Sequence, residues 1–227
     1  MRAGVRWGSG AGKISAVALV GLVGVTAVNP GGGVASGQSR PGPIDYRVTD
    51  IRIVPLGGLS ARDVEPVRRI VAREFPGILV IPGDPEGLPG NAFDAARFQF
   101  NADVVVMWLA ARVPSRSVRF VGVTTGDLFS PGLNFVFSTA LSKGTAAVMS
   151  LARLRDPDEQ LSEERFRKIV LRALGFTFGF ESSPDPSCVM SYSNSLADLD
   201  RKGTAWCGNE PETLRRIQGQ QPVMPHK

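Results

Sequence analysis

Histidine is nearly absent from this chain of 227 residues, whose single imidazole belongs to His226, the penultimate residue. A catalytic zinc centre is built on three protein ligands, mostly imidazoles and carboxylates. The rest of the chain therefore has no imidazole to offer such a centre. The sequence also lacks a G-x-S-x-G elbow, a phosphate-binding glycine loop and a Ser-x-x-Lys motif. Other classes of enzyme gain no support from local motifs.

The first 40 residues contain no acidic side chain, although Arg2, Arg6, Lys13 and Arg40 are basic. The whole chain carries 26 basic and 21 acidic residues, so residues 41–227 hold the other 22 basic residues and a net charge of +1. The excess positive charge therefore belongs to the N-terminus. No basic stripe with interleaved aromatic residues follows it, and we do not expect a nucleic-acid partner.

A hydrophobic run long enough to span a bilayer is also missing from the sequence. The uncharged apolar segment Ile14–Val28 has 15 residues, whereas a membrane-spanning helix needs about 20. Preceded by basic residues, it predicts a signal peptide over residues 1–28. A retained N-terminal membrane anchor is the alternative if residues 31–34 extend the apolar run. Both hypotheses predict an exported domain, either secreted or held at the cell envelope.

Composition divides the remainder of the chain into three parts. Residues 29–46 are rich in Gly, Pro and Ser and predict a flexible linker. Residues 47–218 have the hydrophobic content of one folded domain, and residues 219–227 predict a disordered tail.

Hydrophobic periodicity and turn residues predict strands and helices mixed along the domain. The expected strands are Val48–Leu56, Ile78–Ile81, Arg119–Val123, Asn134–Phe137 and Ala146–Leu151. The expected helices are Ser60–Phe75, Asn91–Arg112, Ser162–Phe178 and Pro211–Gln218. The second half of Asn91–Arg112 is equally compatible with a strand. This order is typical of an α+β (mixed α/β) fold.

The sequence has only two cysteines, Cys188 and Cys207. In an exported protein a disulfide between them would persist. Two buried free thiols are the alternative, and the spacing of the cysteines does not decide between the two.

Three stretches of the sequence, taken in order, carry a family resemblance. They are IVPLG at 53–57, VGVTTGDLF with LNFVF at 121–137, and CVMSYSNSL with the following residues to 207. Together they resemble the archaemetzincins, a branch of the metzincin zinc proteases, over roughly residues 48–210. The resemblance implies a metzincin-like twisted mixed sheet with packed helices, one of which carries the zinc motif.

The motif of that family is H-E-x-x-H-x-x-G-x-x-H, in which three histidines bind zinc and the glutamate is the general base. With the motif aligned on Gly179, Arg172 replaces the first histidine and Ala173 the glutamate. Phe176 and Ser182 replace the second and third histidines. The resemblance therefore implies a former zinc site without catalytic residues, and we expect no metal or other cofactor there.

The resemblance also assigns roles to residues that follow the motif. Met190 matches the Met-turn residue beneath the catalytic zinc, and we expect Phe176 to pack near it. A second, structural zinc of the family is bound by four cysteines, whose positions are Ser183, Cys188, Cys207 and Glu210. Because only two cysteines remain, the resemblance implies that they form a disulfide in place of this zinc.

Loss of the zinc ligands predicts a non-catalytic domain, a pseudoprotease, which the N-terminal segment predicts to be exported. Arg172 should reach water at the rim of a vestigial cleft or pair with an acidic side chain, since an unpaired buried guanidinium is costly. Such a domain keeps the cleft as a groove for a peptide or protein, or keeps only the scaffold, and the sequence names no partner. Membrane contact is expected only through an uncleaved N-terminal segment. The alternatives are a zinc-dependent metalloprotease, as the resemblance alone suggests, and a membrane-tethered interaction protein of the envelope.

Overall fold

A computed structural model describes residues 47–219 of the chain. The segments 1–28, 29–46 and 220–227, for which the sequence predicts a leader, a linker and most of a tail, lie outside the described residues. Within residues 47–219, no helix combines the length and the apolar character needed to cross a membrane.

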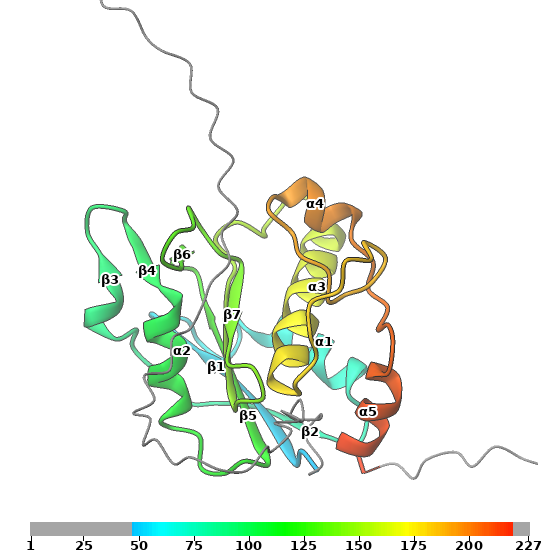
Figure 1. The fold of residues 1–227 in the computed structure, drawn as a ribbon. Coiled ribbons are helices and arrows are strands. Elements are labelled where there is room, and N and C mark those ends of the chain that lie inside the picture. The colour runs from blue at the N-terminus through cyan, green and yellow to red at the C-terminus, as the bar shows by residue number, and fades with distance from the viewer. Residues whose placement is uncertain (1–46, 220–227) are drawn as a thin grey trace, which may run out of the picture. The chain divides into compact units, whose positions relative to one another are not determined.

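A central five-stranded sheet has the strand order β2-β1-β5-β8-β7 (Figure 1). Its strands are β1 (Asp50–Pro55), β2 (Leu79–Pro82), β5 (Val118–Thr124), β7 (Ser138–Ala140) and β8 (Ala146–Ser150). All neighbours pair in parallel except β7, which is antiparallel to β8 and forms one edge of the sheet. The sheet is therefore mixed, as the resemblance implied.

Helices cover both faces of the central sheet. Because the side chains of a strand alternate between its two faces, neighbouring strand residues pack in different apolar clusters. Ile53 and Met149 belong to one apolar cluster, whereas Val54 and Val148 belong to another. Helices α1 (Glu65–Glu74) and α3 (Glu159–Thr177) cover the first face, and α2 (Ala102–Ala110) covers the second (Figure 1). The last two helices of the described residues are the short α4 (Leu196–Arg201) and α5 (Glu210–Ile217).

The predicted helix Asn91–Arg112 is wrong in its first half. After the 3₁₀ turn η1 (Gly90–Ala92), strands β3 (Phe93–Asp94) and β4 (Gln99–Asn101) form a hairpin, which β6 (Leu128–Phe129) completes as a second mixed sheet. Two short polar side chains explain the difference. Asp94 accepts hydrogen bonds from the backbone of the hairpin turn, and Asn101 caps α2 by accepting from Asp103 N at 3.0 Å. Both contacts favour turns and helix starts over helix interiors.

Three other boundaries differ from the sequence prediction. Helix α1 begins at Glu65 with Val64 as its N-cap, five residues after the expected start at Ser60, because Ser60 donates to the Asp63 carboxylate in a preceding turn. Helix α3 begins one turn early because Asp158, and not Ser162, is its N-cap. The strand predicted over Asn134–Phe137 is displaced to β7, since Arg97 draws the carbonyls of Leu133 and Asn134 away from the sheet with 2.9 Å hydrogen bonds. The remaining predicted elements lie within a few residues of their expected bounds. Helix α4 was not predicted, and the mixed fold class is confirmed.

Candidate functional site

The C-terminus of α3 turns the chain back toward its own helix. Gly179 has φ +89°, a conformation that suits glycine because it lacks a Cβ. Phe180 N donates to Gly175 O at 2.9 Å and closes the turn. As a result, Ser182 comes next to Arg172, whose Nη2 donates to Ser182 Oγ at 3.3 Å.

Three of the four positions aligned with the zinc motif meet at one point. The guanidinium carbon of Arg172 lies 4.6 Å from the Phe176 ring centroid and 5.5 Å from that of Tyr192, within the range of a cation–π contact. With the bond to Ser182, Arg172 therefore contacts both other ligand positions. Ala173, the fourth position, is buried in the helix.

The groups at this point do not fit a catalytic zinc. A guanidinium has donors but no acceptor, and it keeps its positive charge. A phenyl ring offers no ligand atom, which leaves the Ser182 hydroxyl alone where zinc takes three nitrogen, oxygen or sulfur ligands. Burial lowers the pKa of Arg172, with a smaller opposing influence from Tyr192.

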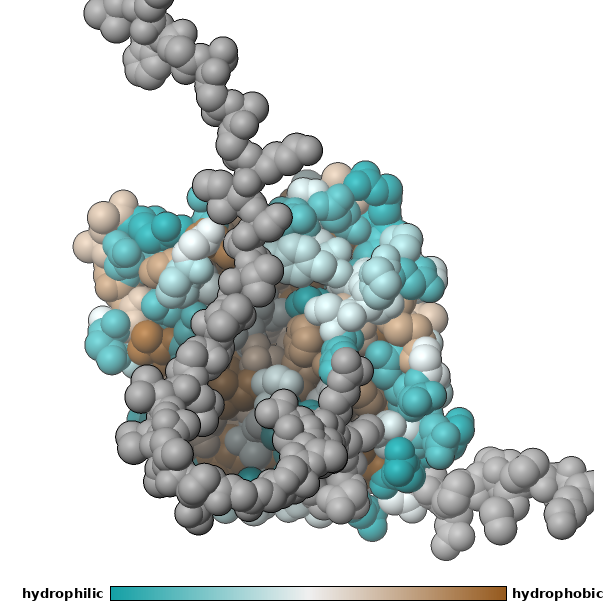
Figure 2. Space-filling view, in the orientation of Figure 1, coloured by the Kyte–Doolittle hydropathy of each residue, from teal (hydrophilic) through white to brown (hydrophobic). Residues whose placement is uncertain are grey.

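Beside Arg172 lies a cleft with a volume of about 500 Å³. It follows the segment 130–139, including the start of edge strand β7, between the N-terminus of α2 and the middle of α3 (Figure 1). Its charged lining residues are Asp103, Arg172 and Lys202. Figure 2 shows hydrophilic residues over the region of α4 and more hydrophobic ones toward the middle of the same face. Arg172 thus opens on a cleft, one of the two environments expected for it.

Lys202 is a member of the cleft that the sequence did not reveal. It is only 3% exposed, and its Nζ donates to Ser191 O at 3.1 Å. Burial, followed by the charges of Arg172 and Lys168, lowers the pKa of Lys202 to about 7. Tyr192 and Ser193 also line the cleft, and the sequence did not predict this. These residues stand in a polar loop, where no local pattern marks a side chain as buried.

A buried ion pair holds this loop on α3. Arg165 of α3 makes two hydrogen bonds with the Asp200 carboxylate, at 2.7 and 2.8 Å. The neighbouring Lys168 donates to Asp200 O at 2.9 Å and pairs with Glu164 at 2.6 Å. Because Asp200 lies two residues before Lys202, these contacts fix the place of the lysine.

Met190 lies directly beneath α3. A Cβ at Gly175 would stand 2.5 Å from Met190 Sδ, so the sulfur packs against the bare helix backbone at this glycine. Phe176 packs against the same apolar cluster. Met190 therefore packs under the helix that carries three of the four aligned motif positions, and its role as a Met-turn residue stays a prediction.

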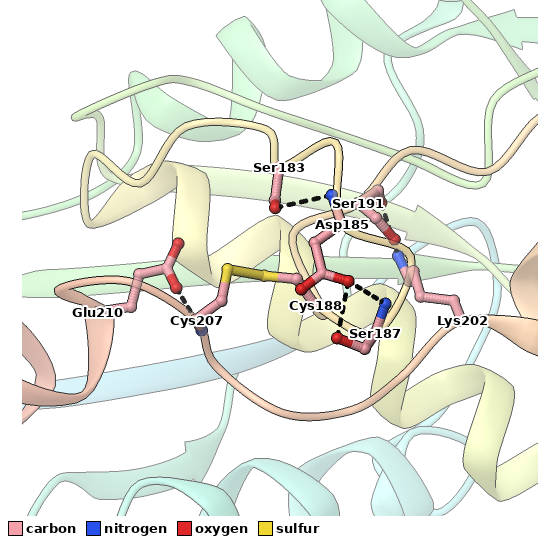
Figure 3. The surroundings of a disulfide bond; sticks show 8 residues. All are labelled: Ser183, Asp185, Ser187, Cys188, Ser191, Lys202, Cys207 and Glu210. Atoms are coloured by element: carbon pink, nitrogen blue, oxygen red, sulfur yellow. Dashed lines mark hydrogen bonds between the residues drawn. A yellow bond between two sulfur atoms is a disulfide. The ribbon is translucent and has the colours of Figure 1, made fainter.

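Cys188 and Cys207 form a disulfide with their Cα atoms 5.6 Å apart (Figure 3), as the resemblance implied. Glu210 lies beside it and accepts a 2.6 Å hydrogen bond from Cys207 N, while Ser183 Oγ accepts from Asp185 N at 3.1 Å. Within the described residues, Cys188, Cys207 and Glu210 are the one group of three His, Cys, Asp or Glu side chains close enough to share a metal. Sulfurs joined to each other are not thiolates, the form of cysteine that binds metal.

Comparison with known proteins places these features in one family. The family model described as peptidase family M54 matches residues 93–216. The archaemetzincin of Methanopyrus kandleri is 43% identical over 129 residues, which cover 57% of this chain and 73% of the relative. That of Pyrococcus furiosus is 36% identical over 180 residues, covering 74% of this chain and 92% of the relative.

Solved structures agree with these sequence relatives. The archaemetzincin structure from M. kandleri has a TM-score of 0.67 at 34% identity and covers 76% of this chain and 96% of its own. That from Archaeoglobus fulgidus, complexed with malonate, has a TM-score of 0.63 at 28% identity and covers 73% and 99%. A zinc-dependent peptidase from Methanocorpusculum labreanum shares the fold, with a TM-score of 0.63 at 24% identity and coverage of 72% and 99%. This chain therefore belongs to peptidase family M54, the family of the archaemetzincins.

Proposed function

We propose that this zinc-metallopeptidase-like domain is a non-catalytic member of its family that keeps the cleft as a peptide-binding groove. One observation carries the proposal. Arg172 contacts both Phe176 and Ser182, and these three residues stand at the positions where the family motif has its three histidines. The contacts support the alignment, because three zinc ligands must converge in the same way.

The chemistry of the four positions argues against peptide hydrolysis by the family's mechanism. A divalent cation would meet the fixed positive charge of Arg172, with Lys202 also near. At about 4 Å and an effective dielectric constant near 20, two unit charges of the same sign repel by about 4 kcal/mol. Ala173, at the position of the general base, has no group that accepts a proton.

Edge strand β7 supports peptide binding. It pairs with β8 on one side, and no described strand pairs with its other side. Ser138 and Thr139 of β7 line the cleft together with Arg172 of α3. An extended peptide can add to such an edge through backbone hydrogen bonds. The A. fulgidus archaemetzincin was solved in complex with malonate, so one member of the family binds a small dicarboxylate.

Export is part of the same proposal. A basic N-terminus followed by the apolar segment Ile14–Val28 supports a signal peptide or an anchor. The Cys188–Cys207 disulfide supports an oxidising compartment. Mass spectrometry of the protein from its native host tests this, because cleavage near residue 28 leaves a secreted domain and an intact leader leaves an anchored one.

Metal analysis tests the loss of catalysis. We expect the natively purified protein to contain well under one zinc per chain and to show no protease activity that a chelator abolishes. The M. labreanum zinc-dependent peptidase, purified in the same way, is the positive control. Near-stoichiometric zinc together with chelator-sensitive proteolysis would contradict the proposal and favour the metalloprotease.

A further inference from the structure

We propose that the cleft binds a carboxylate between Arg172 and Lys202, and that its source is the C-terminal carboxylate of a peptide lying along β7. The inference rests on the proposed function in taking the cleft as the binding site. It goes further in naming the group that is recognised and the two residues that recognise it.

The cleft carries two cations that the protein does not neutralise. Among residues 47–219, neither Arg172 nor Lys202 has a carboxylate within ion-pair distance. Two other buried cations of α3 do have one, since Arg165 pairs with Asp200 at 2.7 Å and Lys168 with Glu164 at 2.6 Å. The fold thus supplies carboxylate partners for neighbouring cations and leaves Arg172 and Lys202 without one.

The same two side chains have hydrogen-bond donors to spare. Arg172 has five N–H groups, of which one is given to Ser182, and its Nε is buried without a partner. Lys202 has three, of which one is given to Ser191 O. Ser193, which also lines the cleft, has a buried hydroxyl without a partner in the described structure. Buried donors are normally satisfied, and a small rotation of these groups toward a bound anion would satisfy them.

The surroundings orient the guanidinium for a planar anion. The Phe176 and Tyr192 rings lie 4.6 and 5.5 Å from it, and Ser182 holds one end. A guanidinium with its plane fixed in this way matches a carboxylate, which it can bind through two parallel hydrogen bonds. Lys202 adds a point charge to the same site.

Asp103 distinguishes the two sides of the cleft. It is the acidic residue lining the cleft, at the N-terminus of α2, and it accepts a 3.0 Å hydrogen bond from Ser130 Oγ. A negative charge there disfavours a carboxylate near α2, while the cations attract it at the α3 side. The C-terminal carboxylate of a peptide along β7 is therefore expected on the α3 side of the cleft, at Arg172, and not on the α2 side.

Isothermal titration of the full chain at pH 6.5 tests this inference. The probes are sodium malonate, a hexapeptide of alternating Val and Thr with a free C-terminus, and the same peptide amidated. We expect the free acid to bind at least tenfold more tightly than the amide, and Arg172→Gln and Lys202→Met each to abolish that difference. Arg73→Gln, which removes an exposed arginine outside the cleft, should leave it unchanged. Arg172→Lys, which keeps the charge, should recover part of the difference and separates charge loss from misfolding.

The outcomes distinguish this inference from the proposed function. Equal binding of acid and amide, or binding of the acid unaffected by Arg172→Gln, overturns the carboxylate site and leaves the peptide groove standing. Arg172-dependent binding of malonate without peptide binding supports the carboxylate site with a small molecule as its source, and speaks against the groove. Failure of all three probes to bind overturns both.

Discussion

Replacing Lys202 with methionine should change how the stability of the protein depends on pH. The folded state lowers the Lys202 pKa from 10.5 to about 7, mainly through burial. Between these two values the unfolded chain binds the proton more strongly, so the free energy of unfolding rises with pH across that window. Below pH 7 the lysine is charged in both states, and the cost of burying it is present in full.

The magnitude follows from the two pKa values. Each pH unit inside the window adds up to about 1.4 kcal/mol. From pH 7, where the folded lysine is half protonated, to pH 9 the gain is about 2 kcal/mol. Lys202→Met keeps the apolar stem and removes the titration, so this part of the slope should disappear. At pH 6 the variant should be more stable than the natural protein, because it loses a buried charge and only one hydrogen bond to Ser191 O.

Urea unfolding at pH 6, 7, 8 and 9, followed by tryptophan fluorescence, measures this slope. The window is favourable because no histidine occurs before His226. Trp206, which packs between Phe75 and Phe180, reports loss of the core.

The charged residues that share a cavity with Lys202 are Asp103, Arg172, Asp198 and Arg201, and Lys168 acts on it from α3. Asp198, whose pKa is lowered by its bond from Ser195, stays ionised from pH 6 to 9. Parallel pH profiles for the natural protein and Lys202→Met would refute the reasoning.

Three further predictions concern the disulfide, a close backbone contact and the former motif. Replacing Cys188 and Cys207 with serine should lower the free energy of unfolding by about 3 kcal/mol. The intact mass of the natural protein should be two hydrogens below that of its reduced form, and free thiols labelled without reductant would contradict this. Gly203→Ala should lower the free energy of unfolding, measured with denaturant, by about 3 kcal/mol, because the new Cβ would collide with Ser187 O. Gly87→Ala is the control and should change it little, since the space around Gly87 is open. Restoring all four motif positions should raise the zinc content of the purified protein, and restoring any one alone should not. The four replacements are Arg172→His, Ala173→Glu, Phe176→His and Ser182→His.

The parallel strands and the long helices could be predicted from the sequence because their signals are local. Strand β8 begins with four consecutive apolar residues, a pattern typical of a strand buried on both faces, and all five of its residues are buried. Helix α3 carries a regular apolar pattern ended by Gly179. The hairpin β3–β4 was missed because Asn101 begins the helix ten residues later than the pattern at Asn91 indicated. Its strands have only two and three residues, too few for a period to appear.

The four positions aligned with the family motif could be named from the sequence, whereas the cleft residues around them could not. Lys202 is buried by contacts with α3, far away in the sequence, and through its hydrogen bond to Ser191 O. Tyr192 reaches Arg172 for the same reason. Such tertiary contacts leave no period or spacing in the chain, so these residues emerge only from the fold.

The disulfide has a consequence for how the domain would respond to a protease. Cys188 and Cys207 enclose the segment that carries Met190, Tyr192 and Lys202 in a closed covalent loop. A single cut inside this loop would therefore release no fragment. The nicked protein would migrate as one band without reductant and as two with it, because each arm of the cut loop would stay attached to the domain through its own cysteine.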